Sequence, residues 1–258
     1  MKNRLSRLYL YLIFAFLYAP ILILMVYSFN ESKYRVWTGF SFKWYLELFS
    51  DSKIMEALTN TILVAVVAAV LSTIIGTIAA IGIAGLKKWK KKVVMDITML
   101  PVLNPDIVTG ISLMLLFYIA KLPTGRLTLI LAHMAFCIPY VILSVMPKLM
   151  QVNNSTYEAA LDLGATPALA TWKVTIPEIM PGVFNGFLMA LTLSIDDFIV
   201  SYFTTGPGVE NLSILIYNAA RKGVSPSINA LSSLMFAVIL ILLVIINIRT
   251  KKESERAA

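Results

Sequence analysis

The chain has 258 residues, of which 59% are hydrophobic and 14% are charged, and its formal net charge is +8. Soluble domains carry roughly 25% charged residues, so this composition excludes an ordinary soluble domain. A helix that crosses a bilayer needs about 20 mostly apolar residues, and the chain is long enough to supply several such helices.

Six segments are apolar enough to cross a membrane. Four carry no charged residue: Leu8 to Asn30, Ala57 to Leu86, Leu127 to Pro147 and Gly223 to Ile248. Two more carry carboxylates: about Ile97 to Ala120 and Gly182 to Thr204. The first segment is longer than the apolar part of a secretory signal, so we interpret it as a helix that is retained. The sequence therefore predicts an all-α integral membrane protein with six transmembrane helices.

The Lys and Arg residues predict the topology of these helices. An even number of spans places both termini on one side, together with the run "KKWKKK" (Lys87 to Lys92) and the loop 150–177. That side carries 14 of the 22 Lys and Arg residues. Short loops rich in Lys and Arg stay in the cytoplasm, so both termini are predicted to be cytoplasmic. The basic surplus is explained by membrane lipids and topology, and no nucleic acid is needed as a partner.

Small residues recur at every fourth position in the second segment. They are Ala68, Ser72, Gly76, Ala80 and Ala84. Such a stripe predicts close approach of another helix. The third and fourth segments contain prolines, at 101 and 105 and at 139 and 147. Helix breaks at membrane depth need protein or water to satisfy the freed backbone groups, so these two helices should face the bundle interior.

His133 and Cys137, both in the fourth segment, are the only histidine and the only cysteine of the chain. A single cysteine excludes an intrachain disulfide and a thiolate metal cluster. Nothing nearby supplies a second metal ligand to His133. We therefore expect its imidazole to form a hydrogen bond between helices.

The loop "EAALDLGATPALATWKVTIP" (158–177) is polar and helical in character. Ser155 and Glu158 predict a capping box at the start of a helix, and Gly164 is placed to end it. Thr166 and Pro167 predict a second helix, which should stop before Pro177. Such short helices need a neighbour to be stable. That neighbour is either the chain's own transmembrane helices or a cytoplasmic partner.

This loop resembles the EAA loop of ATP-binding-cassette importer permeases. Glu158, Ala159, Ala160 and Gly164 stand at the spacing of that pattern, and Asp162 lies between them. The resemblance implies a type I ABC importer (MetI-like) permease fold and a coupling helix that docks on an ATPase subunit. It also implies a five-helix core at 57–250 with its coupling loop at 150–177. Residues 1–56 then form the first helix and a periplasmic loop, and residues 251–258 a cytoplasmic tail.

The sequence contains no GxxxxGK[ST] phosphate-binding loop, which is the motif that cradles nucleotide phosphates. The chain therefore carries no cofactor of its own. ATP and Mg²⁺ are expected to be bound by partner subunits.

Ionisable side chains inside a membrane segment are functional candidates. Asp106 is predicted about 15 Å along its helix at 1.5 Å per residue. Asp196 and Asp197 are consecutive, so one should face a pathway while the other bonds a neighbouring helix, and we favour Asp197 for the pathway.

Carboxylates with no Lys or Arg at the same depth predict a cationic cargo, which aromatic rings also attract. The alternative is that these acids cap helices or bond partner helices. The candidate pathway residues are Asp106, Ser194, Asp196, Asp197, Tyr202 and Trp44.

Three further stretches resemble the permease subunits of spermidine/putrescine importers. They are "SIDDFIVSYFTTGPG", "GVSPSINALSSL" and "PDIVTGISL". The resemblance implies a multi-pass subunit of the bacterial inner membrane. It also implies a second homologous permease subunit, two ATPase subunits and a periplasmic polyamine-binding protein as partners. Ser227 departs from relatives, which often have an acid after the proline.

Other functions stay open at this point. An ABC permease for another organic cation or small solute would share the coupling loop, whereas an ion-coupled secondary carrier would use the carboxylates for protons and transport unaided. A membrane enzyme is disfavoured because the chain has no metal-ligand cluster and only one histidine. The sequence therefore predicts a transport subunit that is not itself an enzyme.

Overall fold

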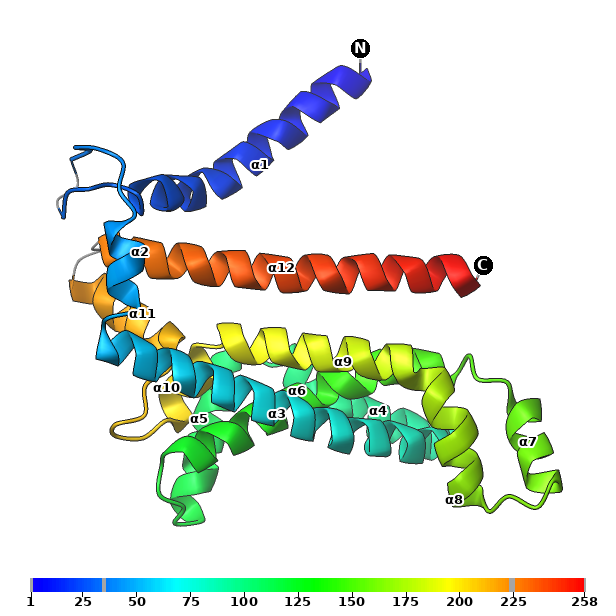
Figure 1. The fold of residues 1–258 in the computed structure, drawn as a ribbon. Helices are drawn as coiled ribbons and strands as arrows, with labels where there is room; N and C mark the ends of the chain where they lie inside the picture. Colours follow the sequence, from blue (N-terminus) through cyan, green and yellow to red (C-terminus); the bar gives the residue numbers. More distant parts are fainter. Residues whose placement is uncertain (1, 34–35, 223–225, 258) are drawn as a thin grey trace.

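The computed structural model describes residues 2–33, 36–222 and 226–257 (Figure 1). These residues form helices joined by short loops, and the only strand-like pairing among them is one bridge between Asn30 and Phe40. The helices are α1 (Lys2–Tyr27), α2 (Lys43–Leu48), α3 (Ser52–Ala84), α4 (Lys88–Leu103), α5 (Asp106–Ile119), α6 (Arg126–Leu149), α7 (Asn154–Asp162), α8 (Pro167–Ala170), α9 (Ile176–Asp196), α10 (Ile199–Thr204), α11 (Leu212–Lys222) and α12 (Pro226–Ala257).

The helical composition confirms the predicted fold class. Five helical stretches are long and apolar enough to cross a membrane: Tyr9–Tyr27, Ser52–Ala84, Arg126–Leu149, Pro167–Asp196 and Pro226–Ile248. The bent pair α4 and α5 supplies a sixth if it is counted as one span. Gly223, the predicted start of the last span, lies outside the described residues.

The third span is not the single helix that was predicted. It divides into α4 and α5, which meet at a bend of 102°. Asn104, at the bend, has an extended backbone (φ −76°, ψ 144°). The reason is that the ring of Pro105 disfavours helical geometry in the residue before it. Asp106 is consequently the first residue of α5 rather than a residue deep inside a helix.

The fifth span also differs from the prediction at both ends. The second helix of the loop does not stop before Pro177 but continues into α9 through a π-helical turn at Thr171–Thr175. In that turn the N–H of Ile176 donates to the carbonyl of Thr171, five residues back. This wider turn ends next to Pro177, which has no N–H of its own to donate. At its other end α9 stops at Asp196, and the residues to Thr204 form the separate helix α10.

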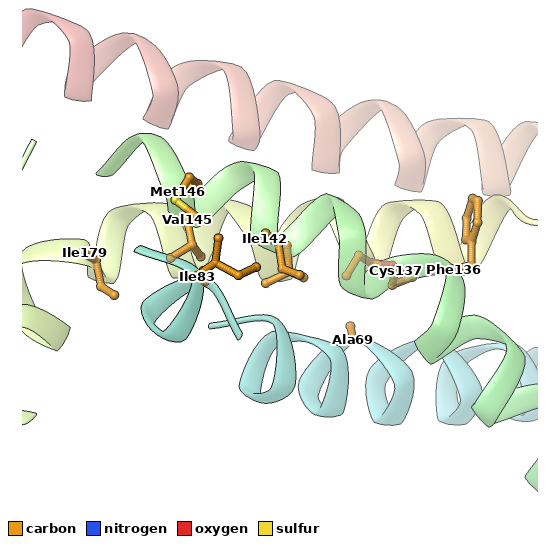
Figure 2. Packing of buried hydrophobic residues seen from close by; sticks show 11 residues of the cluster. Ala69, Ile83, Phe136, Cys137, Ile142, Val145, Met146 and Ile179 are labelled. Carbon is orange, nitrogen blue, oxygen red and sulfur yellow. Dashed lines mark hydrogen bonds between the residues drawn. The ribbon is translucent and has the colours of Figure 1, made fainter. Parts of the chain in front are cut away.

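The main core lies where α3, α6 and α9 pack together. Figure 2 shows Ile142, Val145 and Met146 of α6 beside Ile83 of α3 and Ile179 of α9. The small residues of α3 permit this packing, because a Cβ on Gly76 would lie 2.8 Å from the Cβ of Val141. The stripe of small residues was therefore correctly interpreted as a packing surface.

The helix ends are sorted between two ends of the molecule. Figure 1 shows α7, α8, the start of α1 and the end of α12 toward one end, and α2 and α11 toward the other. A second core at this other end joins Trp44 and Leu48 of α2 to Leu212 of α11 and Leu231 of α12. The predicted coupling loop and Asp196 therefore lie toward opposite ends of one continuous helical stretch, Pro167–Asp196, and α10 follows beyond a break.

Candidate functional site

The loop 150–177 projects from the helical bundle as two short helices (Figure 1). Its first helix does not begin with the predicted capping box. Asn153 is the N-cap, and its side-chain oxygen accepts hydrogen bonds from the Ser155 N–H at 3.0 Å and the Ser155 hydroxyl at 2.6 Å. Asn is as good an N-cap as Ser, and placing the cap at Asn153 starts α7 one residue before Ser155.

The glycine that ends α7 is correctly predicted. Gly164 has a left-handed backbone (φ 86°), and its N–H donates to the Leu161 carbonyl at 2.9 Å. The next N–H, of Ala165, donates to the Ala160 carbonyl at 3.0 Å. Together these two bonds form a Schellman motif, which favours glycine at the left-handed position. The start of α8 is also confirmed, because Thr166 Oγ1 accepts from the Leu169 N–H at 3.3 Å and Pro167 is the first helical residue.

The loop exposes both its charged and its apolar side chains. Glu158, Ala159 and Asp162 are exposed, and Ala160 is half-buried. Leu163, directly before Gly164, is 90% exposed, and Trp172 in the π-helical turn is 69% exposed. Neither residue was predicted from the sequence, although for Leu163 the signal is a large apolar residue beside the turn glycine of a polar loop. The loop thus offers a mixed acidic and apolar surface.

The adjacent carboxylates Asp196 and Asp197 point in different directions, as their spacing predicts, and Asp197, which the sequence favoured for the pathway, is the one that turns inward. The side chain of Asp197 is only 6% exposed. Its carboxylate accepts hydrogen bonds from the backbone N–H groups of Val200 at 3.2 Å and Ser201 at 2.7 Å. Asp197 therefore caps the start of α10, and Asp196 is the exposed carboxylate of the pair.

Two other candidate pathway residues are exposed. Asp106 is exposed in the first turn of α5, where the partial positive charge of the helix N-terminus favours a carboxylate. Tyr202 of α10 is 48% exposed. Its ring lies 5.5 Å from that of Phe198 and 6.3 Å from that of Tyr217, centroid to centroid. Tyr217 comes from α11, a helix that was not predicted from the sequence.

The remaining two candidates are buried in the protein interior. Ser194 is 2% exposed, and its hydroxyl lies 2.6 Å from Nδ1 of His133. Trp44 is 5% exposed, and its indole N–H donates to the Asn30 carbonyl at 2.6 Å. Because both side chains are buried, neither lies on an open surface in this conformation. Each has its polar atom hydrogen-bonded inside the protein.

His133 forms the hydrogen bonds between helices that were predicted for it. From α6 it reaches Ser194 of α9 and, through Nε2 at 2.9 Å, Ser201 of α10. Within the described part of the chain, no three His, Cys, Asp or Glu side chains come together as a possible metal site.

Comparison with known proteins places these features in a family. The family model of the binding-protein-dependent transport system inner membrane component matches residues 72–250, which include α6, the loop and the break between α9 and α10. The chain belongs to this family. It is therefore a multi-pass membrane subunit of a transport system and not an enzyme.

Several members of the family are similar over nearly the whole chain. The chain is 40% identical over 235 residues to the putrescine transport system permease protein PotI of Escherichia coli (strain K12), which covers 88% of this chain and 83% of that protein. It is 35% identical over 247 residues to the spermidine/putrescine transport system permease protein PotC of Haemophilus influenzae, which covers 95% of this chain and 96% of that protein.

Solved structures of ABC importers share the fold. A bacterial ABC transporter that imports the acidic polysaccharide alginate has a TM-score of 0.71 at 17% identity, covering 98% of this chain and 95% of that chain. The MetNI methionine ABC transporter has a TM-score of 0.56 at 16% identity, covering 81% of this chain and 99% of that chain. The helical arrangement is therefore that of an ABC importer permease.

Proposed function

We propose that this chain is the membrane-spanning permease subunit of an ATP-driven bacterial importer of polyamines, and that it forms half of the translocation pathway. The observation that carries the proposal is the similarity to PotI and PotC, two permeases named for putrescine and spermidine/putrescine transport, over 88% and 95% of this chain. Residues 57–250 are the transporting core, preceded by the first helix and its outer loop and followed by a short tail.

The exposed loop supports coupling to a partner ATPase. In the proposal, α7 docks in a groove of that subunit through Glu158, Ala159, Ala160, Asp162 and Gly164. Leu163 and Trp172 supply apolar area that a partner would remove from water. Since the chain has no phosphate-binding loop, two ATPase subunits bind ATP and Mg²⁺. A second permease subunit and a periplasmic polyamine-binding protein complete the importer, and both termini of this chain are cytoplasmic.

The exposed carboxylates support a cationic cargo. Asp196 and Asp106 are the two exposed acids among the candidate pathway residues, and Tyr202 presents a half-exposed ring. Ammonium groups are attracted by carboxylates and by aromatic faces, and both residue types are available. In the proposal, these three residues contact polyamine during its passage, while Asp197, Ser194 and Trp44 act from inside the protein.

Reconstitution in liposomes tests this function. The chain is combined with the second permease and the ATPase subunits, with the binding protein outside and ATP enclosed, and uptake of radiolabelled spermidine and putrescine is measured. We expect uptake that requires ATP hydrolysis and every subunit. A matched liposome preparation holds this chain alone under a pH gradient. Polyamine uptake by the chain alone would show an ion-coupled carrier and reject the proposal, and uptake of another solute in place of polyamines would reject the cargo.

A further inference from the structure

The break between α9 and α10 is bridged by one imidazole. His133 is 1% exposed, and its two ring nitrogens contact serine hydroxyls on opposite sides of the break. Nδ1 lies 2.6 Å from Oγ of Ser194 in the last turn of α9, and Nε2 lies 2.9 Å from Oγ of Ser201 in α10. The ring therefore spans a point where the chain itself has no continuous helix.

The hydrogen-bond groups at this bridge match a neutral imidazole. A neutral ring has one N–H donor and one acceptor nitrogen. Ser201 Oγ accepts from the Asn211 side chain at 2.8 Å and lies 3.3 Å from the Asp197 carbonyl, to which its own proton is directed. Nε2–H can then donate to Ser201, which leaves Nδ1 to accept the proton of Ser194. Each hydroxyl, amide and ring nitrogen of this group thereby has a partner.

The same group of residues fixes the direction of the backbone after Asp196. At Asp197 the chain leaves helical geometry (φ −63°, ψ 126°), and its carboxylate caps α10. Nε2 of His133 also lies 3.5 Å from Oδ2 of Asp197. On the far side, the Asn211 amide that donates to Ser201 also accepts, through Oδ1, from the Ile214 N–H at 3.0 Å, so this one side chain ties the start of α11 to the same cluster. The break is thus held by side chains of α6, α9, α10 and the start of α11.

Two exposed residues depend on how the break is held. Asp196 is the last residue of α9, and Tyr202 lies in the six-residue helix α10. A helix of that length is not stable on its own, so the orientation of α10 has to come from tertiary contacts. His133 supplies such contacts to both helices at once.

We propose that His133 is a positioning residue for polyamine uptake: by bridging Ser194 and Ser201 it holds α9 and α10 at the angle that presents Asp196 and Tyr202 to the cargo. This inference rests on the proposed function, in which the Asp196 carboxylate and the Tyr202 ring contact the polyamine. His133 itself does not touch the cargo, since it is buried.

Two substitutions separate the bridge from the bulk of the side chain. His133→Leu fills much of the same space without a hydrogen bond, whereas His133→Gln keeps an amide that can replace Nε2 toward Ser201. Ser72→Ala is the matched control, because Ser72 is also buried and its hydroxyl donates to the α6 carbonyl of Met134 at 3.4 Å, a contact between α3 and α6 that involves neither α9 nor α10.

Uptake kinetics in the reconstituted importer give the first readout. We expect His133→Leu to raise KM for spermidine about tenfold, as the loss of one to two net hydrogen bonds would. Its maximal rate and its yield of assembled importer should stay near those of the unchanged protein. The KM of His133→Gln should lie between those of His133→Leu and the unchanged protein, and Ser72→Ala should have an unchanged KM.

An unchanged KM in His133→Leu, a fall in maximal rate alone, or an equal effect of Ser72→Ala would each overturn the proposal. If His133→Leu does not assemble, Ser201→Ala takes its place with the same expected rise in KM.

Hydrogen exchange gives a second readout that needs no cargo. In His133→Leu the backbone amides of α10 should exchange faster than in the unchanged protein, while those of α3 should not change. Unchanged exchange in α10 would overturn the positioning role. If instead the unchanged importer takes up no polyamine but α10 loses protection, the proposed function fails while the bridge across the break stands.

Discussion

Two consecutive carboxylates have different environments because the backbone changes direction between them. Asp196 ends α9 with its side chain exposed, whereas Asp197 turns inward and accepts two backbone hydrogen bonds from α10. A carboxylate at a helix N-terminus satisfies N–H groups that the helix cannot satisfy itself. The inner acid therefore satisfies the start of α10, and the outer acid is the one exposed at the surface.

Substitution of each acid should separate these two roles. Asp197→Ala should lower stability by roughly 0.5–2 kcal/mol, which is the usual cost of removing an N-cap. Asp196→Asn should change stability by less than about 0.5 kcal/mol, as exposed substitutions do, and should lower polyamine uptake. Thermal unfolding of the purified protein in detergent measures the first effect, and uptake by the reconstituted importer measures the second.

Glu47→Gln is the control for this pair, because Glu47 is an exposed acid of α2 outside the proposed pathway. It should alter neither unfolding nor uptake. Normal uptake in Asp196→Asn would return this carboxylate to a surface role, and an unchanged unfolding temperature in Asp197→Ala would contradict its assignment as a cap.

The sequence could identify these acids but not their orientation. A charge within an apolar segment is visible in the sequence, so Asp106, Asp196 and Asp197 were all found. Their orientation depends on where the helix breaks, and the stretch from Asp196 to Phe198 contains no Pro or Gly to mark the break. Ser194 and Trp44 were assigned to the pathway for a related reason, since only the tertiary contacts to His133 and Asn30 reveal that they are buried.

At the scale of helices, the features governed by local residues were predicted best. Gly164 and Thr166 end and start their helices as expected, because a left-handed glycine and a threonine cap act within one turn. The π-helical turn at Thr171–Thr175 was not predicted, because the residues of that stretch are compatible with an ordinary helix that stops at the proline. With this turn α8 and α9 form one continuous stretch, Pro167–Asp196, from the exposed loop to the exposed carboxylate.

The left-handed conformation of Gly164 makes the loop testable. A Cβ at this position would meet no atom within 4 Å, so the strain of a substitution comes from φ alone. Gly164→Val should cost about 1–2 kcal/mol at this turn and displace α7 from α8. We expect uptake to fall relative to ATP hydrolysis in the assembled importer, measured as polyamine transported per ATP hydrolysed.

Gly164→Asn is the matched variant, because asparagine adds a side chain yet tolerates the left-handed conformation. Its transport ratio should stay close to that of the unchanged importer. A normal ratio in Gly164→Val would contradict the coupling role of the loop, and an equal loss in both variants would show that added volume, rather than strain, disturbs the docking surface.

At the scale of the whole molecule, charge and shape both support the proposed orientation in the membrane. The basic run Lys87 to Lys92 forms the start of α4, shortly after α3 ends, near the end of the molecule that carries α7, α8, the start of α1 and the end of α12 (Figure 1). Positively charged loops are retained in the cytoplasm. Between the two ends, large apolar side chains of α1, α3 and α12 are exposed, including Phe16, Ile78 and Ile241, and exposed apolar surface of this extent suits a bilayer.

This orientation predicts which side of the membrane reaches each loop. Cys137 is buried, so Cys137→Ala gives a background without reactive thiols. In that background Leu163→Cys, at a position that is 90% exposed, should react with a membrane-impermeant maleimide only in inside-out vesicles, prepared without the ATPase subunits that would cover this position. Ser50→Cys, at an exposed position between α2 and α3, should react only in right-side-out cells or spheroplasts. Three proposed spans separate Ser50 from Leu163 along the chain: α3, the bent pair α4 and α5, and α6. The two positions should therefore lie on opposite sides of the membrane, and a reversed labelling pattern would place the loop outside. No cytoplasmic ATPase could then reach α7, and the proposed coupling would be rejected together with the topology.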